Sequence, residues 1–422
     1  MPAKWLPTLV LGLSTGIIGC GSSTAESSNS GGTGGSKVAT GGGGSGSATA
    51  GSATAGSPTG GSASGGTASG GTASGGTTSG GTTSGGTASG GRAAGGSGGG
   101  GGASTGGTSG SGGGGSTGGK GAPVPSKGCT VTDGLKTLTT GGMSVASGPA
   151  TSTRLKITSG GSSREYIIDV PADYNPTHPY RLIFSWHQAY GSDTGNAIGQ
   201  YPANQGPNFD AKNYAYFGLR REATAANEPA IFIAPGGIGD LPWDYNRDVA
   251  LFDNLLALVD ANLCIDDSRV FTTGFSFGAM MSYALSLGRP SKLRGAVTMA
   301  AANFSFTQPT NTHAPIAYLG ITGMSDTRCP WVSNDAKKEG GKYCVLQHAE
   351  DNGCTGTIQT TTVGSKKYLC YDFEGCKAGY PVKVCTFDGA HTPSSIDDGT
   401  STGDDGLKAF IPPLAWKFIS QF

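Results

Sequence analysis

The residue best placed to do chemistry is Ser276, at the centre of the pentapeptide GFSFG. The pattern Gly-x-Ser-x-Gly holds a serine in a strained turn between a strand and a helix, and it needs small residues on either side. The same spacing also occurs at Ser97, Ser116 and Ser401. Only Ser276 follows a strand-like run, 270–273, and opens a helix-like one, 279–285. The sequence therefore predicts Ser276 as a nucleophile, although a purely structural turn remains the alternative.

A serine hydroxyl becomes a good nucleophile only when a base removes its proton. In hydrolases with this strand–turn–helix serine, an acid and then a histidine follow along the chain. The apolar run 315–321 predicts a buried strand, and the turn after it contains Asp326. We expect Asp326 to be the acid, with Asp335 and Asp351 as fallbacks. The alternative role for Asp326 is a turn residue bonded to its own backbone.

The sequence contains five histidines, and His391 lies beyond the last predicted core strand, 382–387. We expect His391 to be the base. The other candidates are less well placed. His348 lies in a polar stretch and is predicted to be a surface residue. His313 precedes its strand, and His178 lies in a proline-rich turn.

An ester carbonyl under attack develops negative charge, which two preorganised donors can stabilise. One donor is predicted to be the backbone N–H of Phe277, directly after the nucleophile. The other is expected from the loop 186–191. Within that loop Gln188 is the preferred oxyanion donor and Ala189 the alternative, while His187 is expected to shape the loop.

The elements that must position these residues are short apolar runs that alternate with helical stretches. Strands are expected at 166–170, 182–185, 230–234, 270–273, 295–300, 316–321 and 382–387. Helices are expected at 249–263, 279–285 and 414–418. Strands separated by helices of this size imply parallel βαβ units. The fold class predicted for residues 126–422 is therefore α/β, with a doubly wound, mostly parallel sheet.

The beginning of the chain has the pattern of an export signal. Lys4 precedes the apolar run 9–18, which is too short for a permanent membrane helix. The run ends at Cys20 in a sequence that resembles the lipobox of bacterial lipoproteins, where the cysteine is acylated. Residues 1–19 are thus predicted to be a lipoprotein signal peptide, with an ordinary cleaved signal as the alternative. Gly21 favours an outer-membrane destination.

Residues 20–125 consist almost entirely of Gly, Ser, Thr and Ala, and this segment contains no aromatic side chain. Such a segment buries too little apolar surface to offset its conformational entropy, so a disordered linker is expected. A tether that lets an enzyme search solid material and a bare spacer both fit this composition.

The overall charge is balanced, with 28 basic and 28 acidic residues. This balance argues against a nucleic-acid partner and against an electrostatic membrane interaction, so we expect membrane contact only through the N-terminal lipid. No metal or cofactor is expected. The acidic loop 397–405 lacks the Asp-x-Asp-x-Asp-Gly ligand spacing, so a solvated loop is favoured over a calcium site.

The chain has nine cysteines. Apart from Cys20 they are Cys129, Cys264, Cys329, Cys344, Cys354, Cys370, Cys376 and Cys385. An even number in an exported domain suggests disulfides, but spacing alone leaves every pairing open.

Several segments together resemble feruloyl esterases, within a larger group of poly(3-hydroxybutyrate) depolymerase-like and acetylxylan esterases. The likeness lies in residues 164–171, 179–184, 273–278, 375–382 and 387–393. It covers nearly all of 129–422 and none of the linker. It implies an α/β-hydrolase fold, with Ser276, Asp326 and His391 as a catalytic triad.

The resemblance also implies a disulfide between Cys354 and Cys376. The remaining cysteines at 329, 344, 370 and 385 look like additions that form bridges between the acid and the base. One departure is His187-Gln188, where the family usually has His-Gly, and this makes the acyl specificity less secure than the reaction type.

The sequence predicts a secreted, lipid-anchored, monomeric serine esterase, located at the cell surface or outside the cell. Feruloyl groups on plant cell-wall xylan are the first expected substrate. Polyhydroxyalkanoate or another polyester, and acetylated xylan, are the alternatives.

Overall fold

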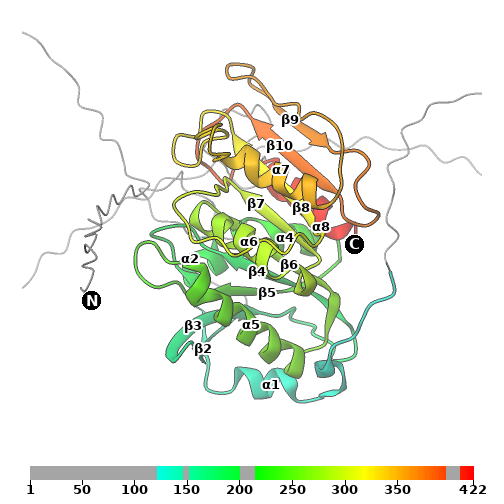
Figure 1. The fold of residues 1–422 in the computed structure, drawn as a ribbon. Coiled ribbons are helices and arrows are strands. Elements are labelled where there is room, and N and C mark those ends of the chain that lie inside the picture. Colours follow the sequence, from blue (N-terminus) through cyan, green and yellow to red (C-terminus); the bar gives the residue numbers. More distant parts are fainter. Residues whose placement is uncertain (1–120, 146–151, 200–213, 396–408) are drawn as a thin grey trace, which may run out of the picture. The chain divides into compact units, whose positions relative to one another are not determined.

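A computed structural model of the chain describes residues 121–145, 152–199, 214–395 and 409–422 (Figure 1). The predicted signal peptide, the lipidation residue Cys20, nearly all of the linker and the acidic loop 397–405 lie outside the described residues. The linker was expected to end at residue 125, but residues just before that point already contact the domain. The N–H of Val124 donates to Oδ1 of Asp266 at 2.9 Å.

The centre of the domain is a ten-stranded sheet with the order β1-β2-β3-β5-β4-β6-β7-β8-β10-β9. Its strands are β1 (Met143–Ser144), β2 (Thr153–Ser159), β3 (Ser162–Asp169), β4 (Tyr180–Trp186), β5 (Ala230–Pro235), β6 (Ile265–Phe275), β7 (Gly295–Met299), β8 (Ala317–Gly323), β9 (Tyr368–Asp372) and β10 (Val382–Phe387). Neighbours from β5 to β10 run parallel, whereas β1, β2, β3 and the edge strand β9 pair antiparallel.

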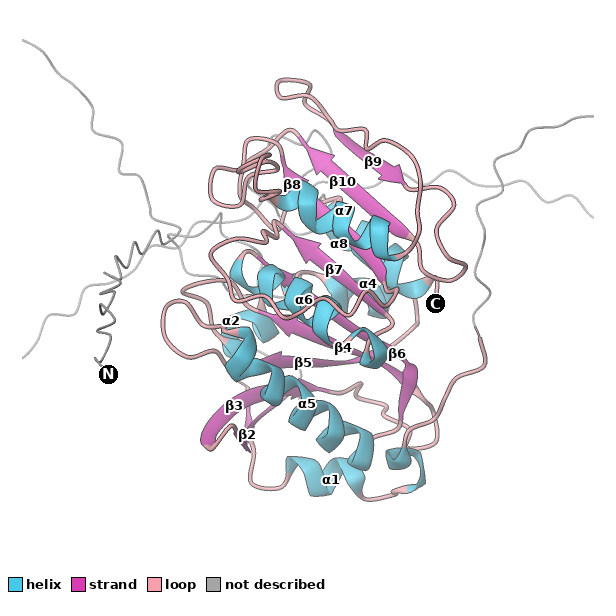
Figure 2. Ribbon diagram, viewed as in Figure 1, coloured by secondary structure: helices cyan, strands magenta, loops and turns pink. Residues whose placement is uncertain are grey.

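Helices cover both faces of this sheet. They are α1 (Gly134–Thr139), α2 (Asp193–Ile198), α4 (Leu219–Ala225), α5 (Tyr245–Asn262), α6 (Phe277–Gly288), α7 (Gly341–Asp351) and α8 (Ile411–Ser420), with 3-10 turns at Lys127–Thr130 and Pro290–Lys292. Figure 2 shows α5, α6 and α7 over one face, with α4 and α8 behind the sheet. None of the helices among the described residues is both long and apolar enough to cross a membrane.

The predicted α/β class is therefore confirmed. Each strand and helix expected from the sequence overlaps an observed one. The central strands β4, β5, β7 and β8 are buried at every residue, which explains why they stand out as continuous apolar runs. No strand was expected at β1, β2 or β9, which are short or have few buried residues.

His348 corrects one expectation, because it is a core residue and not a surface residue. It lies on the buried side of α7 together with Gly341, Cys344 and Val345, at helical spacing. Its Nε2 lies 2.9 Å from the hydroxyl of Ser286, whose own hydrogen is directed to the carbonyl of Tyr283. Burial lowers the pKa of His348 to about 4, so the imidazole is neutral in the folded protein at neutral pH.

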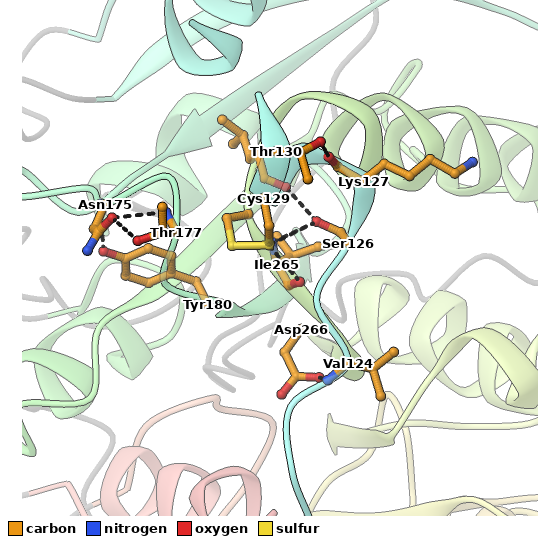
Figure 3. The surroundings of a disulfide bond; sticks show 12 residues. Val124, Ser126, Lys127, Cys129, Thr130, Asn175, Thr177, Tyr180, Ile265 and Asp266 are labelled. Carbon is orange, nitrogen blue, oxygen red and sulfur yellow. Dashed lines mark hydrogen bonds between the residues drawn. A yellow bond between two sulfur atoms is a disulfide. The ribbon is translucent and has the colours of Figure 1, made fainter. Parts of the chain in front are cut away.

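Three disulfides connect described residues: Cys129–Cys264, Cys354–Cys376 and Cys370–Cys385. Figure 3 shows the first, beside which the Ser126 hydroxyl donates to the Leu263 carbonyl and accepts from the Ile265 N–H. The expected set of bridges between acid and base is only partly correct. Cys329 and Cys344 are buried and take no part in these three bridges. Burial raises the pKa of the Cys344 thiol, which keeps it protonated.

The buried His348 predicts a loss of stability on mild acidification. The unfolded chain takes up a proton near pH 6.5, whereas the folded protein resists protonation down to about pH 4. The stabilisation is therefore complete above pH 6.5 and is lost as the pH falls toward 4, by roughly 3 kcal/mol. Urea unfolding measured across this range should show a shallower pH dependence for His348→Gln than for the wild type.

Ser286→Ala is the matched control, because it removes the partner hydroxyl but keeps the titrating imidazole. It should lower stability while leaving the slope against pH close to that of the wild type. Equal slopes for His348→Gln and the wild type would contradict the prediction.

Candidate active site

Ser276 lies in the tight turn between β6 and α6. Its backbone has φ 55° and ψ −120°, a conformation that costs a non-glycine residue about 1–3 kcal/mol. Hydrogen bonds on both sides hold it there. The Ser276 N–H donates to the Met299 carbonyl of β7 at 2.9 Å, and the Ser276 carbonyl accepts from Met280 N–H at 3.0 Å. The turn therefore fixes the hydroxyl at the edge of the sheet.

The two glycines of the pentapeptide are required by close backbone approach. A β-carbon at Gly278 would lie 1.9 Å from the carbonyl oxygen of Trp186 at the end of β4. A β-carbon at Gly274 would lie 2.4 Å from the backbone of Gly278. Both contacts are far inside van der Waals distance, so the start of α6 can approach β4 only with glycine at these positions.

Asp326 lies in the turn after β8, and its side chain is fully buried. Its Oδ1 accepts hydrogen bonds from the backbone N–H groups of Arg328 at 2.8 Å and Cys329 at 2.9 Å. These two bonds are the turn interactions considered as the alternative role for this residue. They occupy only one carboxylate oxygen, and Oδ2 is left to face His391.

His391 follows β10 and reaches both partners. Its Nδ1 lies 2.7 Å from Oδ2 of Asp326, and its Nε2 lies 2.9 Å from Oγ of Ser276. An ionised carboxylate can only accept, so the hydrogen of the neutral ring belongs on Nδ1. Nε2 is then free to accept the serine hydroxyl proton. The ring also packs against Phe275, with 4.7 Å between centroids.

Backbone bonds hold the acid and base loops together. Met324 N–H donates to the Phe387 carbonyl at 2.8 Å, and Ser325 N–H donates to the Gly389 carbonyl at 2.9 Å. Gly323 allows this approach, because a β-carbon there would lie 2.4 Å from the carbonyl oxygens of Gly389 and Ala390. The distance between Asp326 and His391 is therefore set by main chain as well as by side chains.

The loop after β4 forms the opposite wall. Gln188 is buried, and its Oε1 has no hydrogen-bond partner among the described residues. His187 shapes this loop: Nδ1 donates to the Gln188 carbonyl at 2.9 Å, and Nε2 accepts from the Gly237 N–H at 3.1 Å. Burial lowers the pKa of His187 to about 4, which keeps its ring neutral. Trp243 Nε1 also donates to the His187 carbonyl, at 2.7 Å.

A small pocket of about 30 Å³, referred to below as the nucleophile pocket after the predicted role of Ser276, opens beside that residue. Its lining consists of Gln188, Ala189, Tyr190, Phe275, Ser276, Arg328 and His391. Sequence reasoning missed Tyr190, Phe275 and Arg328. The only signals in the sequence for a place at the site were that Phe275 directly precedes Ser276 and that Arg328 lies close to Asp326. Tyr190 is half-exposed, and its N–H donates to the Asp240 carbonyl at 2.8 Å.

The fallback candidates lie elsewhere. Asp351, the last residue of α7, pairs with the exposed His313 at 2.7 Å. Asp335 has a side chain that is 70% exposed and contacts Lys342. His178 packs edge-on against Tyr180, near the start of β4. None of these contacts involves Ser276 or His391.

A serine in a tight turn after β6, an aspartate after β8 and a histidine after β10 follow the chain order of α/β-hydrolases. The sheet, with helices on both faces, is the α/β-hydrolase fold. The site therefore has the architecture of a serine hydrolase.

Comparison with known proteins gives a more specific assignment. The chain is 33% identical to "Probable feruloyl esterase C" of Aspergillus terreus over 257 residues, which span 59% of this chain and 84% of that protein. It is also 33% identical to "Feruloyl esterase D" of Neurospora crassa over 267 residues, spanning 62% and 83%. A ferulic acid esterase from Anaeromyces mucronatus, solved with ferulic acid, shares 14% identity and a TM-score of 0.36, covering 48% of this chain and 79% of that one. No protein-family model matches the chain.

The chain belongs to the feruloyl esterase family. It is a carboxylic ester hydrolase, as the resemblance seen in the sequence predicted.

The Asp326–His391 contact predicts the effect of one conservative change. Asp326→Asn keeps the shape of the side chain, but the asparagine amide can donate an N–H to Nδ1 of His391. This contact favours the tautomer with its hydrogen on Nε2, and Nε2 can then no longer accept a proton. We expect kcat for p-nitrophenyl acetate to fall about 10,000-fold. Asp335→Asn, the same change at an exposed site, is the control and should keep wild-type activity. Retained turnover in Asp326→Asn, with unchanged circular dichroism, would argue against the predicted role.

Proposed function

We propose that Ser276, Asp326 and His391 are a catalytic triad that hydrolyses feruloyl esters on plant cell-wall polysaccharide. The observation that carries the proposal is the continuous chain of contacts, 2.9 Å from Ser276 to His391 and 2.7 Å from His391 to Asp326. The family of the chain supports the feruloyl acyl group.

The reaction takes place in two steps. Nε2 of His391 takes the hydroxyl proton while Oγ of Ser276 attacks the ester carbonyl. The resulting imidazolium is stabilised by the Asp326 carboxylate on its other side. His391 then gives the proton to the sugar oxygen as its bond to the acyl carbon breaks; the sugar leaves with a free hydroxyl, and an acyl-enzyme remains. Water, activated by the same imidazole, attacks the acyl carbon, releases the free acid and restores Ser276.

The developing oxyanion would be held by two backbone donors. Phe277 is the first residue of α6, and N–H groups in the first turn of a helix have no intrahelical acceptor. Gln188 lies across the same pocket. Its N–H is the proposed second donor. Both positions are fixed before substrate binds, which is what makes such donors effective.

The aromatic rings of Tyr190 and Phe275 at the pocket support an aromatic acyl group. Ring stacking of this kind contributes roughly 0.5–1.5 kcal/mol beyond the burial of area. A short aliphatic acyl group would gain little from these rings. This favours a hydroxycinnamoyl ester over the acetyl and polyester alternatives.

The substrate class can be tested by comparing ester types on the full chain. We expect kcat/KM for methyl ferulate to exceed that for methyl butyrate, with slow or no release of monomers from polyhydroxybutyrate granules. Ser276→Ala should abolish every one of these activities while the far-ultraviolet circular dichroism is unchanged. A preference for the granules would overturn the feruloyl assignment but leave the triad in place. Unchanged turnover in Ser276→Ala would refute the triad.

We also propose the domain organisation and location expected from the sequence: a lipoprotein signal at 1–19, a linker at 20–125 and the esterase domain at 126–422. The acyl group would be attached to Cys20 and would hold the enzyme at the cell surface. Three disulfides in the domain support export, because such bonds persist in oxidising compartments.

Lipidation can be tested directly in a bacterial host by metabolic labelling with an alkyne fatty acid. The wild type should incorporate the label, and Cys20→Ser should not. Cys344→Ser is the matched control, since it removes a buried thiol but leaves the lipidation pattern, and it should be labelled like the wild type. Unlabelled wild-type protein with a cleaved N-terminus would instead support an ordinary secretion signal.

A further inference from the structure

A second, larger cavity lies next to the nucleophile pocket. This cleft measures about 410 Å³ and is formed by β2, β3, the start of α2 and the loop after β5. Small-molecule sites are typically about 300–1,000 Å³, so the cleft has the size of a binding site. The pocket at Ser276 measures only about 30 Å³, so it can receive the reacting ester group, and both the acyl ring and the sugar must extend beyond it. The alcohol part of a polysaccharide ester must therefore lie outside that pocket.

The two cavities share one wall. Residues 188–190 line the nucleophile pocket, and the next three residues, 191–193, line the cleft. His187 also lines the cleft, where its Nε2 accepts the Gly237 N–H. Consecutive residues of one loop, 188–193, therefore line both the Ser276 pocket and the cleft.

Ion pairs and hydrogen bonds hold Arg154, Glu165 and Asp193 of the cleft in position, whereas Lys156 extends toward solvent. The guanidinium of Arg154 donates two hydrogen bonds of 3.1 Å to the carboxylate of Asp193 and lies 2.7 Å from that of Glu165. The Glu165 main chain is tied to the loop after β5, because its carbonyl accepts the Gly236 N–H at 2.8 Å. Lys156 Nζ lies 3.7 Å from Glu165 and has a side chain that is 67% exposed.

These pairs decide the class of ligand. Each carboxylate of the cleft lies beside a cation of the cleft, and the third cation of the lining, Arg164, pairs with the buried Asp248. The charges therefore largely cancel, which disfavours a phosphate or a polyanion. The cleft therefore presents hydrogen-bond donors and acceptors with little apolar surface. Sugar hydroxyls both donate and accept hydrogen bonds, so they match such a surface.

We propose that this cleft, lined by Arg154, Lys156, Glu165 and Asp193, is a binding site for neutral sugar residues on the alcohol side of the ester. The inference rests on the proposed function, since it supplies the site for the polysaccharide that carries the feruloyl group. The cleft sets the preference for an ester on a polysaccharide over a simple alkyl ester.

The test fills the cleft with a bulky side chain. Ser163 lines the cleft and is exposed, and its neighbour Ser162 is exposed but lies outside the cleft lining. Ser163→Trp and Ser162→Trp are therefore a matched pair in the full chain. The measured quantity is the ratio of kcat/KM for a feruloylated arabinoxylo-oligosaccharide to kcat/KM for methyl ferulate. We expect Ser163→Trp to lower this ratio about tenfold or more, through KM, and Ser162→Trp to keep the wild-type ratio.

Lys156→Ala is a second test that adds no bulky side chain, and it should lower the same ratio of kcat/KM values. An unchanged ratio in both Ser163→Trp and Lys156→Ala, or an equal fall in Ser162→Trp, would overturn the proposal.

A binding measurement separates this proposal from the esterase function. Titration calorimetry with an unesterified arabinoxylo-oligosaccharide should detect binding to the wild type and to Ser162→Trp, and binding about tenfold weaker or worse to Ser163→Trp. Equal binding to all three proteins, or none to the wild type, refutes the sugar site. A wild type that binds the oligosaccharide but leaves methyl ferulate intact refutes the proposed acyl specificity and not the cleft.

Discussion

The site depends on the hydrogen bond between the buried carboxylate of Asp326 and Nδ1 of His391. A carboxylate removed from water needs partners, and Asp326 has three: two backbone N–H groups on one oxygen and the imidazole on the other. Because the backbone donors fix the carboxylate, they also fix which ring nitrogen carries the hydrogen. The orientation of Nε2 toward Ser276 follows from that choice.

The same interaction requires the acid and base loops to be neighbours. Strands β8 and β10 pair in parallel, so the turns that follow them emerge at the same edge of the sheet. Glycine at position 323 then lets the base loop approach within a distance that any side chain would block. The parallel pairing of β8 and β10 brings the two loops to the same edge, and the absence of a side chain at Gly323 allows their close contact.

Two buried histidines of the domain carry neutral rings. His187 and His348 are both buried, and burial lowers the pKa of each to about 4. His187 links the loops after β4 and β5 through its hydrogen bond with the Gly237 N–H. These loops lie between the nucleophile pocket and the polar cleft. A neutral imidazole suits this role because one nitrogen donates and the other accepts.

The sequence by itself determined the class of fold, the nucleophile turn and the order of the candidate acid and base. These features depend on local patterns: apolar runs of strand length, and a serine between glycines after a strand. The sequence could not decide that His348 is buried, because the stretch around it mixes apolar residues with polar ones. Only packing against α6 and β8 encloses the ring. It also left the cysteine pairing open, since a disulfide depends on where distant strands bring two sulfur atoms.

Only the tertiary structure brought Tyr190 and Arg328 to Ser276 and formed the cleft from β2, β3 and two loops. Their residue types carry no signal of their own, and the segments are far apart in the chain. Local chemistry fixes which residues can react, because reactivity depends on residue type and nearby backbone. Which surfaces face those residues is decided by strand order and loop packing, which are non-local.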